Sequence, residues 1–363
     1  MGILSNLFNK NSTPVITTYA EFWAWFRKNE SQFFASVKGG NDIDQQFFNK
    51  LSPMLDQLHE GIFFLTGMLN KETVELVLTA DGFIKRIPYI EDLVSAAPNI
   101  QGWKFTALKP PMDAEDFTID FAGNIFSNES LSFYANEHSD TRDKIDLLVV
   151  HKDYVEADNS NFVKGTDIFL ENYLGELNLV TMIDNLTIGA ADDCMDLIPI
   201  NKLKDYLIWR EKEFFEKYGE LRWLEENDNF SSLKAELEDG KPLVAIVNSA
   251  LLEWEGKASH PWILAIEIKY NGEDNNGMPD DVAYAEMERF EDQLLIELRP
   301  IEGYLNVGRQ TADGLRIVYF ACTEFRRPVK VMDQLISQEG NKIDIQYDVY
   351  KDRYWGSFDY FIP

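Results

Sequence analysis

The segment 271–281, NGEDNNGMPDD, carries residue types that could hold a metal ion. Its four acids and three asparagines offer oxygen atoms, the ligands that calcium prefers. An EF-type calcium loop places such ligands at its first, third, fifth and twelfth positions and glycine at its sixth. With Gly277 at the sixth position, Gly272 occupies the first and Ala283 the twelfth, so two required ligands are missing. The segment therefore predicts a turn rather than a calcium site.

The residues after this turn predict a helix over 282–298. Its apolar face consists of Ala283, Met287, Phe290, Leu294 and Leu298, and its polar side carries Glu286, Glu291 and Asp292. Pro279, Asp280 and Asp281 fit the first helical turn, where proline loses no hydrogen bond and acids meet the positive end of the helix dipole.

Other chemistry lacks a local signature. The four histidines, which show no HxxxH, HExxH or HxH spacing, are His59, His138, His151 and His260. No GxSxG elbow, GxxxxGK[ST] loop or GxGxxG loop is present. The paired acids Asp192–Asp193 and Asp280–Asp281 could serve glycosidase or metal chemistry. Adjacent acids point in different directions on most backbones, so solvated turns explain them better, and we assign no catalytic, cofactor-binding or metal-binding residue.

Two short segments near the C-terminus are candidates for interaction. Arg326 and Arg327 form a basic spot on an acidic chain, where they could hold an anion or pair with nearby carboxylates; pairing is favoured. Tyr354 and Trp355 lie in the aromatic tail YWGSFDYF. They could pack over the sheet as a closing strand or present an exposed aromatic contact surface.

The charge balance limits the classes of partner. The 363 residues include 62 acids and 34 Lys and Arg, which gives a formal net charge of -28. Such a surface repels nucleic-acid phosphates and anionic membranes. It attracts a basic protein, although acidity more often provides solubility alone.

The compartment follows from the cysteines and the chain start. Cys194 and Cys322 are far apart and support neither a disulfide framework nor a zinc site. The start MGILSNLFNK lacks the features of a signal peptide, and no segment approaches the roughly 18 apolar residues of a membrane helix. We expect a reduced, cytoplasmic protein.

The elements that must position these residues indicate an α+β fold, with mixed or antiparallel sheets and helices on one face. Residues 1–18 read as a leader and 19–218 as an N-terminal α+β domain. In that domain the order strand, strand, helix, strand occurs twice, before a helix from Pro199 to Tyr218. This favours two ββαβ halves that share one sheet, and whether they form one domain or two stays open.

Residues 219–363 read as a C-terminal domain, with the polar stretch 225–229 near its start. After one preliminary strand, the pattern is strand 262–270, helix 282–298, strands 303–308 and 314–322, helix 329–337 and strand 343–350. This is the order of a ferredoxin-like split βαβ unit. We expect this fragment to fold alone.

Several motifs carry a resemblance to a known family. Gly277-Met278-Pro279-Asp280, the helix MERFEDQLL and the segment GRQTADGLRIVYF are similar to the bacterial domain of unknown function catalogued as family 695, over roughly residues 220–363. The segments WAWF, LTADG and AAPNIQGWKFTALKP resemble a region often found ahead of that domain. The resemblance implies a bacterial cytosolic setting and no particular activity. In topology and acidity, the C-terminal order more distantly resembles the ferredoxin-like regulator that inhibits a bacterial ribonuclease.

Two classes of function fit these observations. The first is a non-catalytic acidic binding or regulatory protein that acts on a basic protein partner. The alternative is a hydrolase-like enzyme with a dispersed carboxylate site. A pocket that holds several acids with raised pKa values would favour the enzyme. The oligomeric state is left open.

Overall fold

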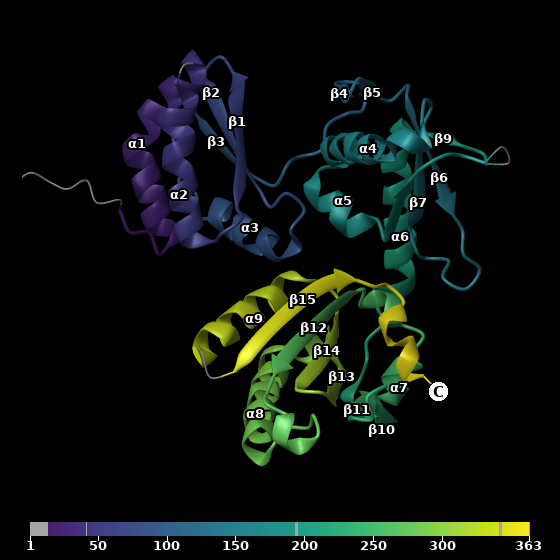
Figure 1. The fold of residues 1–363 in the computed structure, drawn as a ribbon. Helices are drawn as coiled ribbons and strands as arrows, with labels where there is room; N and C mark the ends of the chain where they lie inside the picture. The colour runs from purple at the N-terminus through teal and green to yellow at the C-terminus, as the bar shows by residue number, and fades with distance from the viewer. Residues whose placement is uncertain (1–13, 41, 193–194, 341–342, 363) are drawn as a thin grey trace, which may run out of the picture. The chain divides into compact units, whose positions relative to one another are not determined.

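The computed structural model describes residues 14–40, 42–192, 195–340 and 343–362. The chain divides into two compact units, residues 1–110 and 111–363 (Figure 1). Each unit contains helices together with mixed or antiparallel sheets, so the α+β class is confirmed.

The first unit packs helices against a three-stranded sheet. Its elements are α1 (Tyr19–Gly39), the π-helix η1 (Asp44–Phe48), α2 (Asn49–Leu58), β1 (Phe63–Asn70), β2 (Thr73–Thr79), α3 (Ile87–Ser95) and β3 (Trp103–Ala107). Helix α1 begins after Thr18, whose side chain and that of Glu21 form a capping box. Phe26 packs edge-on against Trp103 and Phe105, so the aromatic residues of the first helix serve the core.

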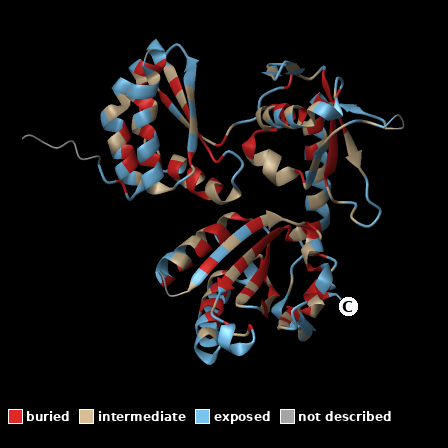
Figure 2. Ribbon diagram, viewed as in Figure 1, coloured by how far each residue is buried: buried red, intermediate tan, exposed pale blue. Residues whose placement is uncertain are grey.

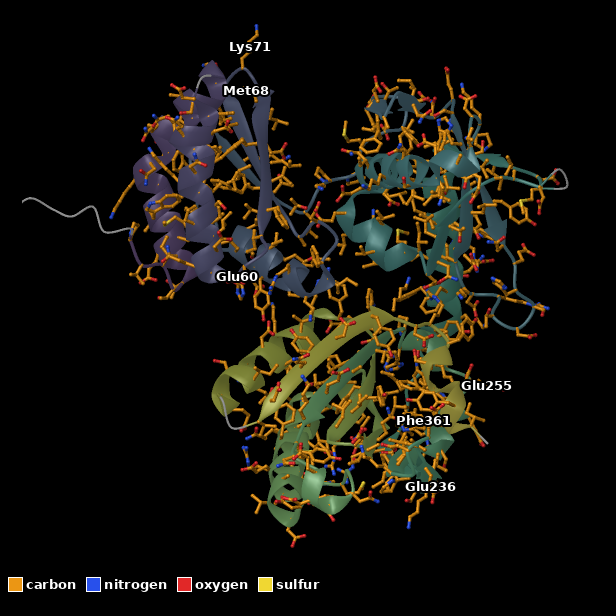
Figure 3. The ribbon with its side chains drawn as sticks, viewed as in Figure 1. Glu60, Met68, Lys71, Glu236, Glu255 and Phe361 are labelled. Atoms are coloured by element: carbon orange, nitrogen blue, oxygen red, sulfur yellow. The ribbon has the colours of Figure 1, made fainter. Side chains whose placement is uncertain are left out.

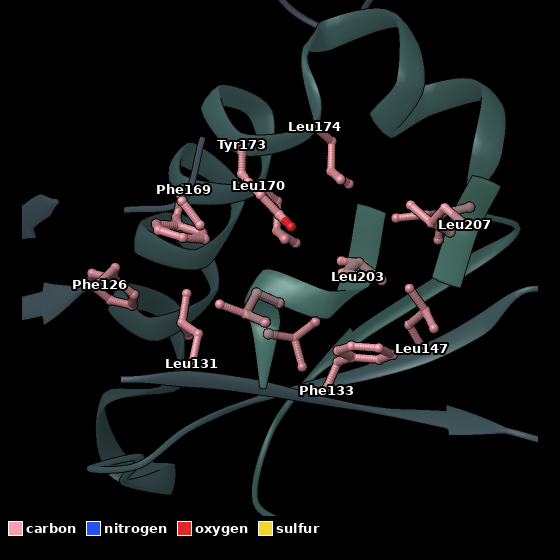
Figure 4. Packing of buried hydrophobic residues seen from close by; sticks show 14 of the residues in the cluster. Phe126, Leu131, Phe133, Leu147, Phe169, Leu170, Tyr173, Leu174, Leu203 and Leu207 are labelled. Carbon is pink, nitrogen blue, oxygen red and sulfur yellow. The ribbon is translucent and has the colours of Figure 1, made fainter. Parts of the chain in front are cut away.

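The second unit begins with a two-stranded sheet, β4-β5, followed by a four-stranded sheet in the order β8-β7-β6-β9. Its elements are β4 (Ile119–Phe121), β5 (Asn124–Phe126), β6 (Leu131–Asn136), β7 (Asp146–His151), α4 (Asn159–Leu174), α5 (Glu176–Met182), β8 (Asn185–Ile188), β9 (Ile198–Pro199) and α6 (Leu203–Tyr218). Figure 4 shows the core of this part, in which Phe126, Phe133 and Phe169 are buried. Helix α4 approaches Phe126 closely at Gly165. A Cβ there would lie 2.2 Å from the ring of Phe126, so only glycine fits. Helix α5 continues to Met182, so the last strand of this part, β8, begins only at Asn185.

Both segments of the N-terminal region have the order strand, strand, helix, strand. In each, the first two strands are antiparallel and the third is parallel to the second: β1, β2 and β3 in one case, and β6, β7 and β8 in the other. The two sets belong to separate sheets in different units, so the single shared sheet expected from the sequence is not formed.

The rest of the second unit contains a six-stranded sheet in the order β10-β11-β13-β14-β12-β15. Its elements are β10 (Phe230–Glu236), β11 (Pro242–Asn248), α7 (Ser249–Leu252), β12 (Trp262–Lys269), α8 (Asp281–Glu297), β13 (Tyr304–Ala312), β14 (Leu315–Cys322), α9 (Arg326–Glu339), β15 (Asp344–Lys351) and the 3-10 helix η9 (Gly356–Phe361). Strand β14 lies between β12 and β13, which makes β12–α8–β13 a split βαβ unit. The boundary predicted at 218/219 falls between the four-stranded and six-stranded sheets of this unit and stays a prediction.

Helices α8 and α9 lie on the same face of the six-stranded sheet. The row Arg309, Val318, Ile266 and Tyr347 crosses β13, β14, β12 and β15 on one face. In this row Arg309 bonds Glu291 of α8, and Tyr347 bonds Asp333 of α9. The central strands β12 and β14 are mostly buried (Figure 2).

The opposite face of the sheet is covered by the C-terminal tail and α7. Its buried cluster consists of Ala245, Val247, Leu251, Leu252, Ile263, Leu305, Val307, Tyr319, Ala321, Trp355, Phe358 and Phe361. Phe361, labelled in Figure 3, belongs to η9. The central strands β12 and β14 therefore place alternate residues against the helices on one face and in this cluster on the other.

Candidate functional site

The two helices leave part of their face of the six-stranded sheet open. Neighbouring strands are about 4.8 Å apart and a helix is about 10 Å wide, so two helices cover roughly four strands. On β10, Phe230 and Lys234 point to the helix face and are exposed, and on β11, Val244 and Ile246 are only half-buried. On β11, Ala245 and Val247 point to the other face and are buried. Strands β10 and β11 thus form an uncovered strip beside α8.

We call this strip, together with the adjacent side of α8, the α8 shelf. It is formed by Phe230, Ile246, Glu288, Asp292, Leu295, Asn306 and Arg309. A pocket of about 270 Å³ lies over it. A second pocket of about 390 Å³ adjoins the first and shares Phe230, Leu295 and Asn306 with it. We refer to these two adjoining pockets together as the groove.

The groove combines negative charge with exposed apolar surface. Five carboxylates line it, from Glu225, Asp228, Glu288, Glu291 and Asp292, against two guanidinium groups, from Arg299 and Arg309. Phe230 is 46% exposed and Leu295 is 42% exposed. Such a surface suits a ligand that is both cationic and apolar.

Helix α8 is held against the sheet by a buried ionic cluster. The Arg316 Nη1 donates to Glu291 Oε1 at 2.8 Å, and Arg309 donates to the other oxygen of the same carboxylate. The Arg316 Nε donates to Thr311 Oγ1 at 3.1 Å, and the Tyr284 ring lies 4.9 Å from its guanidinium carbon. Arg316 is 2% exposed. The sequence placed Glu291 on the polar side of the helix, and the structure corrects this because two arginines from β13 and β14 surround the carboxylate.

An irregularity in β13 shapes the floor of the groove. The register between β13 and β14 shifts between Asn306 and Gly308. Gly308 has φ +143°, and a Cβ there would lie 2.4 Å from the carbonyl oxygen of Ile246, so glycine is required. Asn306 lines both pockets, and its buried Oδ1 accepts no hydrogen bond.

The aromatic tail closes the sheet instead of exposing a contact surface. Trp355 is 1% exposed, and its indole Nε1 donates to the His260 carbonyl at 2.8 Å. It therefore cannot serve as the exposed contact considered from the sequence, and the tail forms a 3-10 helix in place of a closing strand. Tyr354 donates from its hydroxyl to Asp143 Oδ2 at 2.8 Å, so it also acts within the second unit.

The basic pair at the start of α9 contacts carboxylates. Arg327 Nη2 lies 3.5 Å from Glu297 Oε2 and 3.8 Å from Glu302 Oε2, and it donates to the Glu297 carbonyl at 2.8 Å. The guanidinium carbon of Arg326 lies 4.8 Å from the Phe325 ring centre. For Arg327 the structure matches the favoured pairing with nearby carboxylates.

The acidic loop 271–281 is a turn that caps α8. Asp280 is the N-cap, and its Oδ1 accepts from the Ala283 amide at 2.8 Å. The helix begins at Asp281, so Pro279 precedes the first turn instead of lying within it. Asn276 and Gly277 have positive φ and complete the turn. In the part of the chain that the structure describes, no group of three or more His, Cys, Asp or Glu could hold a metal ion.

The histidines act as structural residues. His151 bonds the Ile125 carbonyl at 2.9 Å, and His138 bonds Asp146 Oδ2 at 2.9 Å. His260 is 3% exposed and contacts Ser259 Oγ through Nδ1 at 2.8 Å. Burial, together with the charge of Arg222, lowers the pKa of His260 to about 4.

Two carboxyl groups that line other pockets have lowered pKa values, which favour the ionised form. Asp143 and Asp184 are partly or largely buried, which opposes ionisation, but cationic and hydrogen-bonding partners hold both pKa values below the usual range. Asp167 on α4 differs, because burial and the charge of Glu171 raise its pKa. A general acid needs a raised pKa, so Asp143 and Asp184 are poor candidates for that role.

The one cysteine among the described residues offers no reactive site. Cys322 is a free, buried thiol on β14, and burial raises its pKa well above the usual value, which makes it unreactive. Cys194 and Asp193 lie outside the described residues.

The fold and the shelf define an α+β protein whose C-terminal sheet presents an open, acidic and apolar groove beside one helix. Residues 233–362 match the family model described as "Family of unknown function (DUF695)", which confirms the resemblance of the C-terminal part. The match includes α8, β11 and β13 of the shelf. Searches of curated proteins and of solved structures found no match. Among the described residues, no helix combines the length and the apolar character that a membrane crossing requires.

Proposed function

We propose that this protein is a non-catalytic acidic binding protein of the bacterial cytoplasm, and that it acts by holding a basic segment of a protein partner in the α8 shelf. The observation that carries the proposal is the composition of the groove, in which four exposed carboxylates, from Glu225, Asp228, Glu288 and Asp292, lie beside exposed apolar side chains. The net charge of -28 supports it, because a chain of this charge attracts basic surfaces over long range.

The anchoring of α8 also supports a binding role. The cluster of Glu291 with Arg309 and Arg316 fixes the helix, so Glu288 and Asp292 keep their positions without a partner. A preorganised surface loses little conformational entropy on binding. The exposed carboxylates then provide attraction, and the apolar floor provides the area that is buried.

We further propose that the C-terminal part is ferredoxin-like. The order β13-β14-β12-β15, with all neighbours antiparallel and two crossover helices on one face, supports this. Strands β10 and β11 extend this sheet beyond its helices and supply the floor of the groove. The distant likeness to a regulator of a ribonuclease rests on this topology and on acidity, and it points to regulation by binding.

The proposal is tested with a panel of fluorescent basic peptides, each about 20 residues long, titrated with the full chain. The shelf variant carries Glu288→Gln and Asp292→Asn. The matched control carries Glu273→Gln and Glu286→Gln, two exposed acids of the same region outside the groove, so both variants lose the same charge. We expect at least one peptide class to lose about tenfold or more in affinity with the shelf variant alone. Equal affinities for shelf variant and control throughout the panel would overturn the proposal.

A further inference from the structure

We propose that the occupant of the α8 shelf is a basic amphipathic α-helix of the partner, which lies alongside α8 as a third helix on the sheet. This inference rests on the proposed function and specifies the form of the bound segment.

The width of the open strip matches one helix. Six strands at about 4.8 Å spacing form a sheet roughly 29 Å wide from edge to edge, and two helices cover about 20 Å of it. The uncovered strip consists of two strands, β10 and β11, so its width is about 10 Å. A helix packs on a sheet at about this spacing, so a third helix completes the layer.

The apolar contacts suit the periodicity of a helix. Phe230 and Ile246 form the floor, and Leu295 forms the wall on α8. A helix that carries apolar side chains at positions i, i+3 or i+4, and i+7 presents one stripe to such a groove.

An added strand fits this surface less well. An extended segment would have to pair with the edge strand β10, where Lys234 and Glu236 (labelled in Figure 3) are exposed. Charged side chains on an edge strand oppose pairing with another strand. The floor of the groove is a face of the sheet. An extended segment lying on that face cannot form backbone hydrogen bonds with the strands beneath it.

The charges on the wall have helical spacing. Glu288 and Asp292 are four residues apart on α8, which separates them by about 6 Å along its axis. Two cations at i and i+4 on a neighbouring helix have the same separation, so both pairs form together. Asn306 lines both pockets, so a polar side chain of the same helix would meet it between the two carboxylates and the second pocket. The 17 residues of α8 set the length of the occupant at about 25 Å.

The test compares two peptides of identical charge, titrated into the full chain. Each is about 17 residues long, with Leu on one stripe and Lys or Arg elsewhere, and the first is hydrocarbon-stapled as a helix. The second carries two central prolines, which prevent the helix. Affinity comes from fluorescence anisotropy, and protection of β10, β11 and α8 comes from hydrogen exchange. We expect the stapled peptide to bind about tenfold tighter or more, and to protect these three elements.

Variants separate the shelf from general charge attraction. Leu295→Lys should weaken binding of the stapled peptide about tenfold, because the substitution introduces a cation into the groove and removes an apolar contact. Ile296→Lys is the matched control, since Ile296 is exposed on the same helix and does not line the groove. If both peptides bind the shelf with equal affinity, the proposal of a helical occupant is wrong and the proposed function still stands. If no basic peptide shows shelf-dependent binding, both proposals are wrong.

Discussion

The Nζ of Lys351 lies 2.7 Å from Asp184 Oδ1, and both side chains are buried. Lys351 also donates to the Thr181 carbonyl at 2.6 Å, and Arg353 Nε donates to Asp184 Oδ2 at 2.8 Å. Burial lowers the pKa of Lys351 to about 8, although the charge of Asp184 raises it. This cluster joins the end of β15 to the segment between α5 and β8, and so links the four-stranded and six-stranded sheets of the second unit.

The first prediction concerns this link. Asp184→Asn leaves Lys351 and Arg353 buried without an anion, so we expect a loss of about 3–5 kcal/mol in the free energy of unfolding. Urea unfolding of the full chain should also separate into distinguishable transitions for the two sheets. The control Asp344→Asn removes an exposed partner of Lys269 and should cost less than about 1 kcal/mol. Similar small losses in both variants would contradict this account.

The second prediction concerns the anchoring of α8. Glu291→Gln removes the charge that two buried or half-buried arginines share, and we expect a loss of about 3 kcal/mol or more in stability. Glu288→Gln on the same helix should cost less than about 1 kcal/mol, since Glu288 is exposed and lies 3.9 Å from Arg309 Nη2. The measurement is thermal and urea unfolding of the full chain. Equal stability of the two variants would show that the buried cluster does not anchor the helix.

Regular elements of the C-terminal part were predictable because their patterns are local. The turn at 271–281 and the helix after it follow from Pro279, the acids and the spacing of Met287 and Phe290. Alternation along 262–270 predicts a strand, and the structure adds that its two sides enter different cores. The separate sheets of the N-terminal region were not predictable, because strand pairing depends on contacts that no local pattern records.

The candidate site was largely missed for the same reason. The motif GRQTADGLR contains Arg309 and Arg316, but only the pairing of β13 with β14 places both beside Glu291. Tyr284, Glu288, Glu291 and Leu295 have helical spacing, which is the one local signal for the wall of the groove. The groove is open because two helices are too few to cover six strands. The number of strands predicted from the sequence does not show which of them stay uncovered.

The third prediction concerns pH. His260 has a folded pKa of about 4, below its unfolded value near 6.5, so the unfolded state binds the proton more readily. The associated stability is fully present above pH 6.5 and is lost as pH falls toward 4, by up to roughly 3 kcal/mol. The urea midpoint should decrease between pH 6.5 and 4.5, and His260→Gln should show a flatter profile. Identical profiles for the two proteins would refute the assignment. Asp143 and Asp184, whose pKa values are lowered, reduce stability only at lower pH, below about 3.9.

The fourth prediction concerns the acidic loop. Asp280→Ala removes the N-cap of α8 and should cost about 1 kcal/mol, measured by thermal unfolding. Calcium should leave the unfolding temperature unchanged, because Gly272 and Ala283 occupy two positions where ligands are required. A calorimetric titration that shows one strong calcium site, lost on Asp274→Ala, would refute the assignment of this loop as a turn.

The central claim is that an acidic groove on this chain captures a basic protein segment. Opposite charges accelerate the encounter of two proteins, and salt screens these charges. The salt dependence of the association rate therefore tests the mechanism. The decisive measurement is stopped-flow association of the full chain with its tightest-binding basic peptide at increasing salt. Between about 0.05 and 0.5 M salt we expect the association rate to decrease roughly tenfold or more, with a smaller decrease for the variant with Glu288→Gln and Asp292→Asn. An association rate that does not depend on salt would contradict the claim.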